Sequence, residues 1–265
     1  MKQVRFTIQI KNADGLCLAE TQGSGRLDLV YRQAYRPGDW LELKADQPGY
    51  CQVQLEDSLP PVTGYLKGPF TLVVPFGEKL SGYSPKCFSG DLHLLQVRAA
   101  WPEEVKAYRN LAFNPLDSHD NDGLFPHVFA NVETRGEAQF AARNAINGNA
   151  ASESHGSYPY ESWGINRRED AALTIDFGCA ASLDQARLTL RADFPHDNYW
   201  QQAQLSFSDG SRELLKLQKS GQPQTFALKP RTVTWARLEQ LLKDPADPSP
   251  FPALTQLELW GTPAL

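Results

Sequence analysis

The chain has 265 residues, a length that favours two domains. Of these residues 41% are hydrophobic and 22% charged, so the chain can bury a hydrophobic core. Nineteen glycines and 19 prolines favour a loop-rich, all-β protein over a helical bundle. The net charge of −5, with no basic stripe, zinc-finger spacing or long apolar run, argues against nucleic acid or a membrane as a partner.

The first 100 residues predict a small β-sandwich with no catalytic signature. Val4, Phe6, Ile8 and Ile10 alternate along the first expected strand, which places them on one face. Short strands separated by glycine and proline turns are typical of such a fold. The expected strands are residues 3–10, 26–32, 40–44, 50–55, 70–75 and 92–98.

The amino-terminal residues and the cysteines indicate where the protein works. Residues 1–15 alternate like a strand and lack the apolar core and small-residue cleavage site of a secretory signal. The four cysteines are scattered and form no CxxC pair, so we expect buried free thiols in a reducing compartment. Both observations predict a cytoplasmic protein.

Residues 101–128 are expected to form a helix-bearing connector between the two domains. Residues 102–104, PEE, suit a helix N-terminus, and apolar side chains then recur at helical spacing as far as Asn114-Pro115. The segment 117–123, DSHDNDG, superficially resembles a calcium-binding loop. It has Ser118 at the first acidic position, however, so we predict a solvated turn.

Residues 129–265 predict a second β-sandwich. Asp209-Gly210, directly after an expected strand, predicts a tight hairpin because this pair tolerates the positive φ angles of such turns. The segment 235–243 is an exception, since its pattern also fits a partial helix. The expected strands are residues 171–177, 187–191, 203–208, 224–228, 232–238 and 255–260.

Four sequence blocks in this second half carry a resemblance to a known family. They read AINGN at residues 145–149, AALTIDFG at 171–178, LSFSDGS at 205–211 and ALTQLELWG at 253–261. In this order they resemble the discoidin, or coagulation-factor C-domain, family, which includes many galactose-binding-like carbohydrate-binding modules. The resemblance covers roughly half the chain, from about residue 130 to the end. It implies a jelly-roll-like β-sandwich whose loops present a small-ligand site, here expected to hold a sugar.

The resemblance also implies where the sugar is bound. Sugar-binding members use two loops, which correspond here to residues 153–164 and 191–200, and their ligand-binding His, Arg and Asn fall near His155, Arg191 and Asn198. The two loops also contain other planar polar groups and aromatic rings, which suit sugar hydroxyls and ring faces. The expected ligand-binding residues are Glu153, His155, Trp163, Arg167, Arg191, Asp193, His196, Asn198 and Trp200.

Structural roles for some of these residues are left open by the sequence. Arg167, Arg191 and Asp193 also fit an ion-pair network that holds the loops together. Trp163 fits a core position as well as a stacking platform. His119 and His127 of the connector are candidates to fold over the sugar site from outside.

A structural calcium site is common in the family that the sequence resembles. The family forms it from the Asp of a D-G turn, carbonyls of the same loop and a Glu in the last strand. Here Asn147 replaces the Asp and Gln256 aligns with the Glu, and the loss of two charges weakens a calcium site. We therefore expect no cofactor, and the residues to examine for calcium are Asn147, Asn149 and Ser152.

An enzyme is the main alternative to a binding protein. Glu153 or Asp193 with His155 or His196 supplies candidates for an acid–base pair. A glycoside hydrolase also needs two facing carboxyl groups, for which Glu161 and Asp197 are further candidates. The chain has no G-x-S-x-G elbow, P-loop, H-E-x-x-H or dinucleotide motif. The sequence therefore predicts a non-catalytic carbohydrate-binding protein, with a glycoside hydrolase or lyase, or a protein–protein interaction module, as alternatives.

Overall fold

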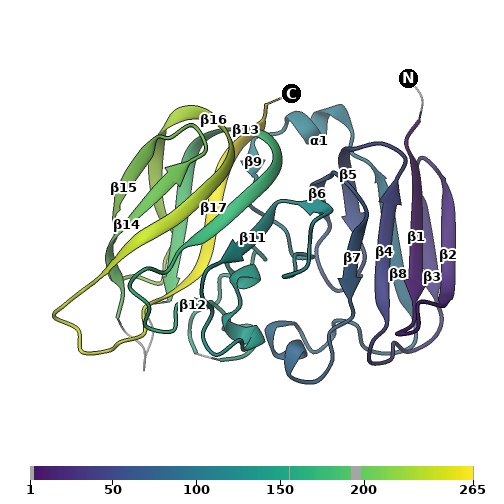
Figure 1. Ribbon diagram of the computed structural model, residues 1–265, viewed down its shortest axis with the longest axis horizontal. Coiled ribbons are helices and arrows are strands. Elements are labelled where there is room, and N and C mark those ends of the chain that lie inside the picture. Colours follow the sequence, from purple (N-terminus) through teal and green to yellow (C-terminus); the bar gives the residue numbers. More distant parts are fainter. Residues whose placement is uncertain (1–2, 155, 192–197, 265) are drawn as a thin grey trace.

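The structure, a computed structural model, describes residues 3–154, 156–191 and 198–264 (Figure 1). Two β-sandwiches lie side by side, and both termini lie at the same end of the molecule, at the top of Figure 1. The predicted all-β fold is confirmed. No helix in the described part of the chain is long and apolar enough to cross a membrane.

The first sandwich packs a four-stranded sheet against a five-stranded sheet. Phe6, Ile8 and Ile10 point into the core and are at most 2% exposed, because a strand places every second side chain on the same face. The four-stranded sheet has the order β2 (Cys17–Ser24), β1 (Arg5–Lys11), β4 (Trp40–Ala45), β7 (Phe70–Val73). The five-stranded sheet has the order β10 (Leu124–Phe125), β6 (Val62–Leu66), β5 (Gly49–Gln54), β8 (His93–Ala99), β3 (Leu27–Tyr31).

The six strands predicted in this part of the chain are confirmed as β1, β3, β4, β5, β7 and β8. The sequence did not predict β2 and β6. The side chains of β2 are all exposed or half-buried, so the strand lacks the apolar alternation that marks the others. In β6 the central inward-facing residue is Gly64, which has no side chain to contribute to such a pattern.

The four cysteines are free thiols. Cys51 and Cys87 are buried, and burial raises the pKa of the Cys51 thiol to about 12, which makes it unreactive at neutral pH. The expectation of buried thiols is wrong for Cys17, which is exposed because it begins the outer strand β2, and Cys179 is half-buried.

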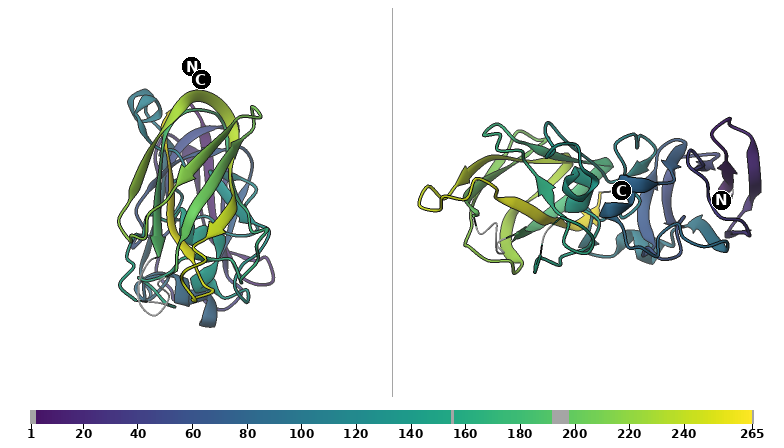
Figure 2. Two further views of the ribbon diagram at one scale, coloured as in Figure 1. Left: turned by 90° about the vertical axis from the view of Figure 1, so that its left-hand side faces the viewer. Right: turned by 90° about the horizontal axis from the view of Figure 1, so that it is seen from below.

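The second sandwich is one large antiparallel sheet that folds over on itself. Its two longest strands shift register between Asp176 and Ala181, and the arch that they form crosses one end of the sandwich (Figure 2). The strand order is β12 (Trp163–Gly164), β17 (Ala253–Pro263), β13 (Leu173–Arg191), β16 (Gln224–Lys243), β14 (Trp200–Phe207), β15 (Arg212–Lys216). Two short strands pair outside this path, β11 (His127–Ala130) with β13 and β9 (Arg109–Asn110) with β17.

The long, bent strands β13 and β16 explain how the predicted strands differ from the observed ones. The two strands predicted at 171–177 and 187–191 correspond to the two ends of the single strand β13, which begins at Leu173, and the two strands predicted between 224 and 238 both belong to β16. The partial helix expected at 235–243 is wrong, because this segment continues β16. The hairpin at Asp209-Gly210 is confirmed: Gly210 has φ +82° and its N–H donates to the Phe207 carbonyl at 2.9 Å.

The connector contributes a strand to each sandwich. The helix α1 (Pro102–Lys106) begins where predicted, and Glu104 accepts a hydrogen bond from the Trp101 N–H at 2.8 Å. The prediction that the helix continues as far as Asn114 is wrong. The chain instead forms β9, and the Leu111 N–H donates to the Leu259 carbonyl at 2.7 Å. Short 3-10 helices complete the structure: η1 (Gly77–Gly82), η2 (Ala138–Phe140) and η3 (Ala142–Ala145).

A buried polar network holds the connector between the two sandwiches. The Asp117 carboxylate has no exposed area and accepts hydrogen bonds from the Val128 N–H at 2.8 Å and Asn121 Nδ2 at 2.6 Å. His127 Nδ1 lies 2.9 Å from the same carboxylate. The solvated turn predicted at 117–123 is therefore wrong for Asp117 and Asn121, which are buried and bonded to the backbone and to each other, whereas His119, Asp120 and Asp122 are exposed.

This network predicts a pH dependence of stability. Burial alone lowers the pKa of His127, but the hydrogen bond and the charge of Asp117 outweigh it, and the pKa lies above its ordinary value of 6.5. A group whose pKa is higher in the folded than in the unfolded protein stabilises the fold fully at pH values below its unfolded pKa. This stabilisation is lost as the pH rises through its pKa in the folded protein. We therefore expect the free energy of unfolding to fall as the pH rises from about 6 to about 8.

Chemical denaturation at several pH values checks this prediction. His127→Gln removes the titrating group, so its free energy of unfolding should depend less on pH over that range. His119→Gln is the control, since the His119 side chain is 68% exposed and its pairing with Glu133 is more screened by solvent. An unchanged pH dependence in His127→Gln would contradict the assignment.

Candidate functional site

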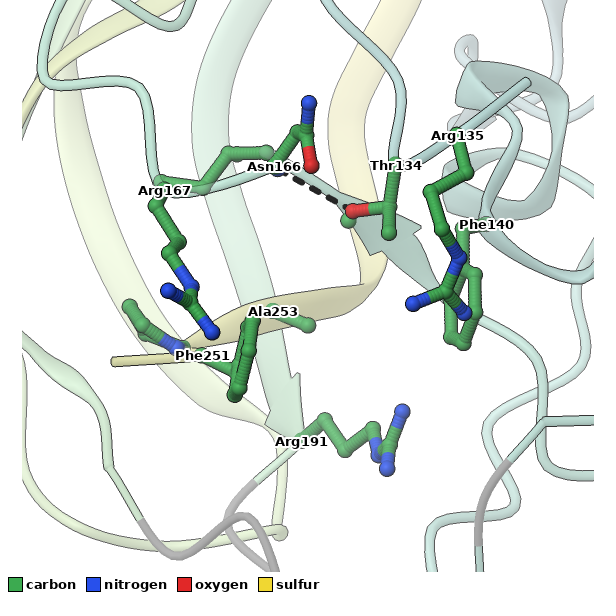
Figure 3. Close-up of a pocket in the computed structure, with 11 residues that line it drawn as sticks. Thr134, Arg135, Phe140, Asn166, Arg167, Arg191, Phe251 and Ala253 are labelled. Atoms are coloured by element: carbon green, nitrogen blue, oxygen red, sulfur yellow. Dashed lines mark hydrogen bonds between the residues drawn. The ribbon is translucent and has the colours of Figure 1, made fainter. Parts of the chain in front are cut away.

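A pocket of about 140 Å³ opens where three strand ends of the second sandwich meet (Figure 3). Ala253, the first residue of β17, pairs with Gly164 of β12 on one side and with Arg191, the last residue of β13, on the other. The space depends on small residues, because a Cβ on Gly164 would lie 2.5 Å from Thr134 Oγ1. The pocket, called here the arginine pocket, is lined by Thr134, Arg135, Phe140, Gly164, Ile165, Asn166, Arg167, Arg191, Phe251, Pro252 and Ala253.

Arg191 forms the inner side of the arginine pocket. It is only 2% exposed, and its Nη1 lies 3.5 Å from Ser162 Oγ. Figure 3 shows its guanidinium extending from the end of β13 below Ala253 into the space that the other lining residues surround. A buried guanidinium at the base of a pocket supplies several N–H donors in a fixed plane.

Arg167 and Phe251 form a second side. The Arg167 guanidinium lies 4.4 Å from the centre of the Phe251 ring, a distance typical of a cation–π contact. Arg167 belongs to the loop after β12 and Phe251 to the segment just before β17. Stacking therefore ties together two loops that lie far apart in the sequence, and it restrains a charged side chain that would otherwise be mobile in solvent.

The backbone around this pocket is strained. Of the five described non-glycine residues with positive φ, three line the arginine pocket, namely Arg135 (54°), Asn166 (48°) and Arg167 (62°). This region costs free energy for residues with a side chain. Thr134 Oγ1 holds the loop in this conformation by accepting the Asn166 N–H at 3.0 Å (Figure 3). Clustered strain of this kind indicates a functional site.

Arg135 lies on the third side, next to Phe140. Its guanidinium carbon is 5.9 Å from the Phe140 ring centre, and its Nη2 donates to Glu137 Oε2 at 2.9 Å. Arg135 also lines a larger groove of about 770 Å³ that runs along η1 and η2 between the two sandwiches. The arginine pocket and this groove therefore meet at Arg135.

The structure brings together two of the predicted ligand-binding residues, Arg167 and Arg191, and corrects three others. Trp163 and Trp200 have no exposed area, so neither can stack on a sugar. Both rings pack in the hydrophobic core of the second sandwich, and the Trp163 Nε1 donates to the Val132 carbonyl at 2.9 Å. Asn198 is also fully buried, and its amide donates to the carbonyls of Asp247 and Ser249, so it holds the loop before β17.

The remaining predicted residues do not form a catalytic pair among the described residues. Glu153 is exposed and does not line the arginine pocket. Glu161 is 1% exposed, and burial raises the pKa of its carboxyl. The predictions for His155, Asp193, His196 and Asp197 lie outside the described residues. His119 and His127 do not line the pocket, since they contact Glu133 and Asp117.

Several pocket residues were missed by the sequence reasoning. Thr134, Arg135 and Phe140 precede the loops that the resemblance implied, and Phe251 follows them. A usable signal for Phe251 was present, because it is a single aromatic residue in the proline-rich segment 248–252 directly before an expected strand. No comparable signal marked Thr134 or Phe140.

The residues around Gln256 do not fit the calcium site that the family resemblance implies. Gln256 Nε2 lies 2.5–3.0 Å from four oxygens, those of the Asn144, Asn149 and Thr255 carbonyls and of the Asn147 side chain. Its Oε1 accepts the Gly148 N–H at 3.0 Å, which fixes the orientation of the amide. An amide nitrogen therefore occupies the centre of this set of oxygens, where a cation would have to lie.

The oxygens around Gln256 Nε2 are equally unsuited to calcium. Calcium favours several hard oxygen ligands, preferably charged ones, whereas the oxygens that surround Gln256 Nε2 are all neutral. Ser152 is directed elsewhere and lies against Gly221. No cluster of three or more His, Cys, Asp or Glu side chains suited to a metal occurs among the residues that the structure describes.

Comparison with known proteins gives matches to solved structures only. No protein-family model matches the sequence, and neither does any curated protein. Chitosan-binding module 1 of a chitosanase/glucanase from Paenibacillus sp. IK-5 is 17% identical, with a TM-score of 0.39 over 57% of this chain and 98% of that one.

Two further similar structures are those of a lectin domain and of another carbohydrate-binding module. The lectin domain of lectinolysin, complexed with Lewis B antigen, is 16% identical, with a TM-score of 0.43 over 58% of this chain and 96% of that one. The family 32 carbohydrate-binding module of C. perfringens NanJ, in complex with galactose, is 15% identical, with a TM-score of 0.38 over 50% of this chain and 91% of that one. These three matches cover between 50% and 58% of this chain.

Proposed function

We propose that the chain is a non-catalytic carbohydrate-binding protein that holds a sugar in the arginine pocket. The observation that carries this proposal is the placement of Phe251 and Arg167 opposite the buried Arg191. An aromatic face packs against the C–H surface of a sugar ring, and planar guanidinium groups donate paired hydrogen bonds to neighbouring oxygens. The pocket therefore offers both kinds of contact that a sugar requires.

The size of the pocket supports recognition of one sugar unit. Its volume of about 140 Å³ is well below the roughly 300–1,000 Å³ of sites that enclose a drug-sized ligand. A single ring fits such a space with part of its surface left in solvent. This favours a terminal sugar or a branch, with the rest of a longer chain outside the pocket.

The lining also favours binding over catalysis. The charged side chains among the described lining residues are all arginines, which do not exchange protons at neutral pH. Hydrolysis of a glycoside requires two carboxyl groups placed across the bond to be cleaved. Glu153 and Glu161 do not line the pocket, so they do not supply that pair.

Truncation of Phe251 tests the site. A glycan-array screen of the intact protein identifies a sugar, and titration calorimetry measures its affinity for the wild type and for Phe251→Ala. We expect the variant to bind about tenfold more weakly, because loss of an aromatic contact and its buried area costs about 1.4 kcal/mol.

Phe129→Ala is the matched control, since Phe129 is 48% exposed on β11 of the same sandwich and does not line the pocket. Equal losses in the two variants, or no loss in Phe251→Ala, would place the sugar elsewhere. Mass spectrometry of the bound sugar over several hours shows whether it is consumed, and consumption would replace the binding proposal with the enzyme alternative.

A further inference from the structure

We infer that the sugar bound in the arginine pocket carries an anionic oxygen group, a carboxylate or a sulfate. This inference rests on the proposed function and names the class of sugar. Its basis is the convergence of Arg135, Arg167 and Arg191 on one pocket of about 140 Å³. Figure 3 shows the three side chains on different sides of the same space.

The hydrogen-bonding character of the lining is the first argument. A guanidinium carries five N–H donors and no acceptor. A neutral sugar presents hydroxyls that each need an acceptor as well as a donor, whereas an ionised carboxylate or sulfate only accepts. Among the described lining residues the side-chain acceptors are Thr134 Oγ1 and Asn166 Oδ1, and Thr134 Oγ1 already accepts the Asn166 N–H. The described lining therefore holds many more donors than acceptors, which matches an anionic group better than a neutral ring.

The charge of the pocket is the second argument. The whole chain has a net charge of −5, so three arginines in one small pocket do not follow from a generally basic surface. Arg135 is partly neutralised by Glu137, which lies outside the arginine pocket. Arg167 forms no ion pair within the described residues and contacts the Phe251 ring instead. An arginine that stacks on an aromatic face keeps its N–H edge available for an oxyanion.

The third argument is that two of the three arginines are restrained by their own backbone and by neighbouring rings. Arg135 and Arg167 both have left-handed φ angles, which a residue with a side chain adopts only when its surroundings impose them. The guanidinium groups of Arg135 and Arg167 also lie against the Phe140 and Phe251 rings, so contacts within the protein hold both at the pocket. A site built in this way gains affinity when an anion enters, because the arginines do not have to be reorganised.

Matched pairs of sugars test the inference on the intact protein. Affinities are measured by calorimetry for galactose against galacturonate and galactose 6-sulfate, and for glucose against glucuronate, at two salt concentrations. We expect at least one acidic sugar of a pair to bind about tenfold more tightly than its neutral partner, since hydrogen bonds to a charged group are the stronger ones. The preference should decrease at the higher salt concentration. Comparison of galacturonate with the 6-sulfate then distinguishes a carboxylate from a sulfate.

Arg167→Gln is the decisive variant, because Arg167 is exposed and its replacement leaves the core intact. It should lose most of the preference for the acidic sugar and change the affinity for the neutral partner much less. Arg168→Gln is the control, since this neighbouring arginine pairs with Asp170 and does not line the pocket. It should bind like the wild type.

The failures of this inference and of the proposed function are distinguishable. Equal or tighter binding of neutral sugars, with a Phe251-dependent affinity, would overturn the inference and leave a carbohydrate-binding site in place. The inference would also be overturned if Arg167→Gln lost equal affinity for the acidic and the neutral sugar of a matched pair. If neutral and acidic sugars both failed to bind, the proposed function itself would be wrong.

Discussion

Replacing Gln256 with glutamate is expected to lower the free energy of unfolding by about 3–5 kcal/mol in the presence of EDTA. Gln256 is 3% exposed, and its amide nitrogen lies 2.5–3.0 Å from four neighbouring oxygens, toward which its two N–H bonds are directed. A carboxylate in its place turns these attractive contacts into repulsive ones and buries a negative charge. Thermal and urea denaturation of the wild type and of Gln256→Glu give the difference directly.

Calcium separates this explanation from a general packing defect. The introduced carboxylate and the Asn144, Asn147 and Asn149 oxygens form a set of ligands that suits a cation, so added calcium should restore part of the stability of Gln256→Glu. We expect EDTA and calcium to leave the wild type unchanged. Gln222→Glu, at an exposed loop position, is the control and should behave like the wild type. A wild type that loses stability in EDTA would contradict our description of the Gln256 network.

Trp163→Ala is expected to cost about 3–5 kcal/mol of folding stability, the typical cost of removing a large aromatic side chain from a core. The Trp163 ring has no exposed area, lies 6.3 Å from the ring of Trp200 and donates a hydrogen bond to the Val132 carbonyl. The variant loses the buried area and leaves that carbonyl without its donor. Urea denaturation measures the loss, and Trp163→Phe should lose less because it refills most of the cavity.

Trp101→Ala is the comparison for the same substitution at the surface. Trp101 is 60% exposed and stacks on Arg98 at 3.9 Å, a contact worth about 1 kcal/mol or less. A stable Trp163→Ala variant that had lost only its sugar affinity would contradict the core assignment. That result would return Trp163 to the stacking role that the sequence allowed.

The fold could be predicted where a residue pattern reports local geometry. Phe6, Ile8 and Ile10 alternate because only one face of β1 is buried, and Asp209-Gly210 forms the hairpin because its backbone conformation is set locally. The residue pattern gave a wrong prediction where pairing with a distant strand determined the local structure. Tyr108 and Leu111 have helical spacing, but the backbone between them pairs with β17 and leaves Tyr108 50% exposed.

The site could be predicted only in part, because its residues come from distant segments. Arg167 and Arg191 lie in the loops that the family resemblance implied, whereas Phe251 joins them only because β17 pairs between β12 and β13. Trp163 and Trp200 have the residue type that a sugar site uses. Their burial depends on packing across the sandwich, which the sequence of a loop does not report.

The role of Gln256 shows a similar limit. The sequence indicated that Gln256 aligns with a family glutamate and that a charge had therefore been lost. It did not indicate that the amide nitrogen would lie among the oxygens of residues 144–149, more than 100 positions away in the chain. Only the pairing of β17 beside β13 brings that loop to the side chain.

Hydrogen–deuterium exchange of the intact protein, with and without the tightest-binding saccharide from the glycan screen, tests the central claim most directly. We expect exchange to slow in three segments that line the arginine pocket, residues 134–140, 164–167 and 251–253. Slower exchange confined to other surfaces, with these three segments unchanged, would show that the arginine pocket is not where the sugar binds.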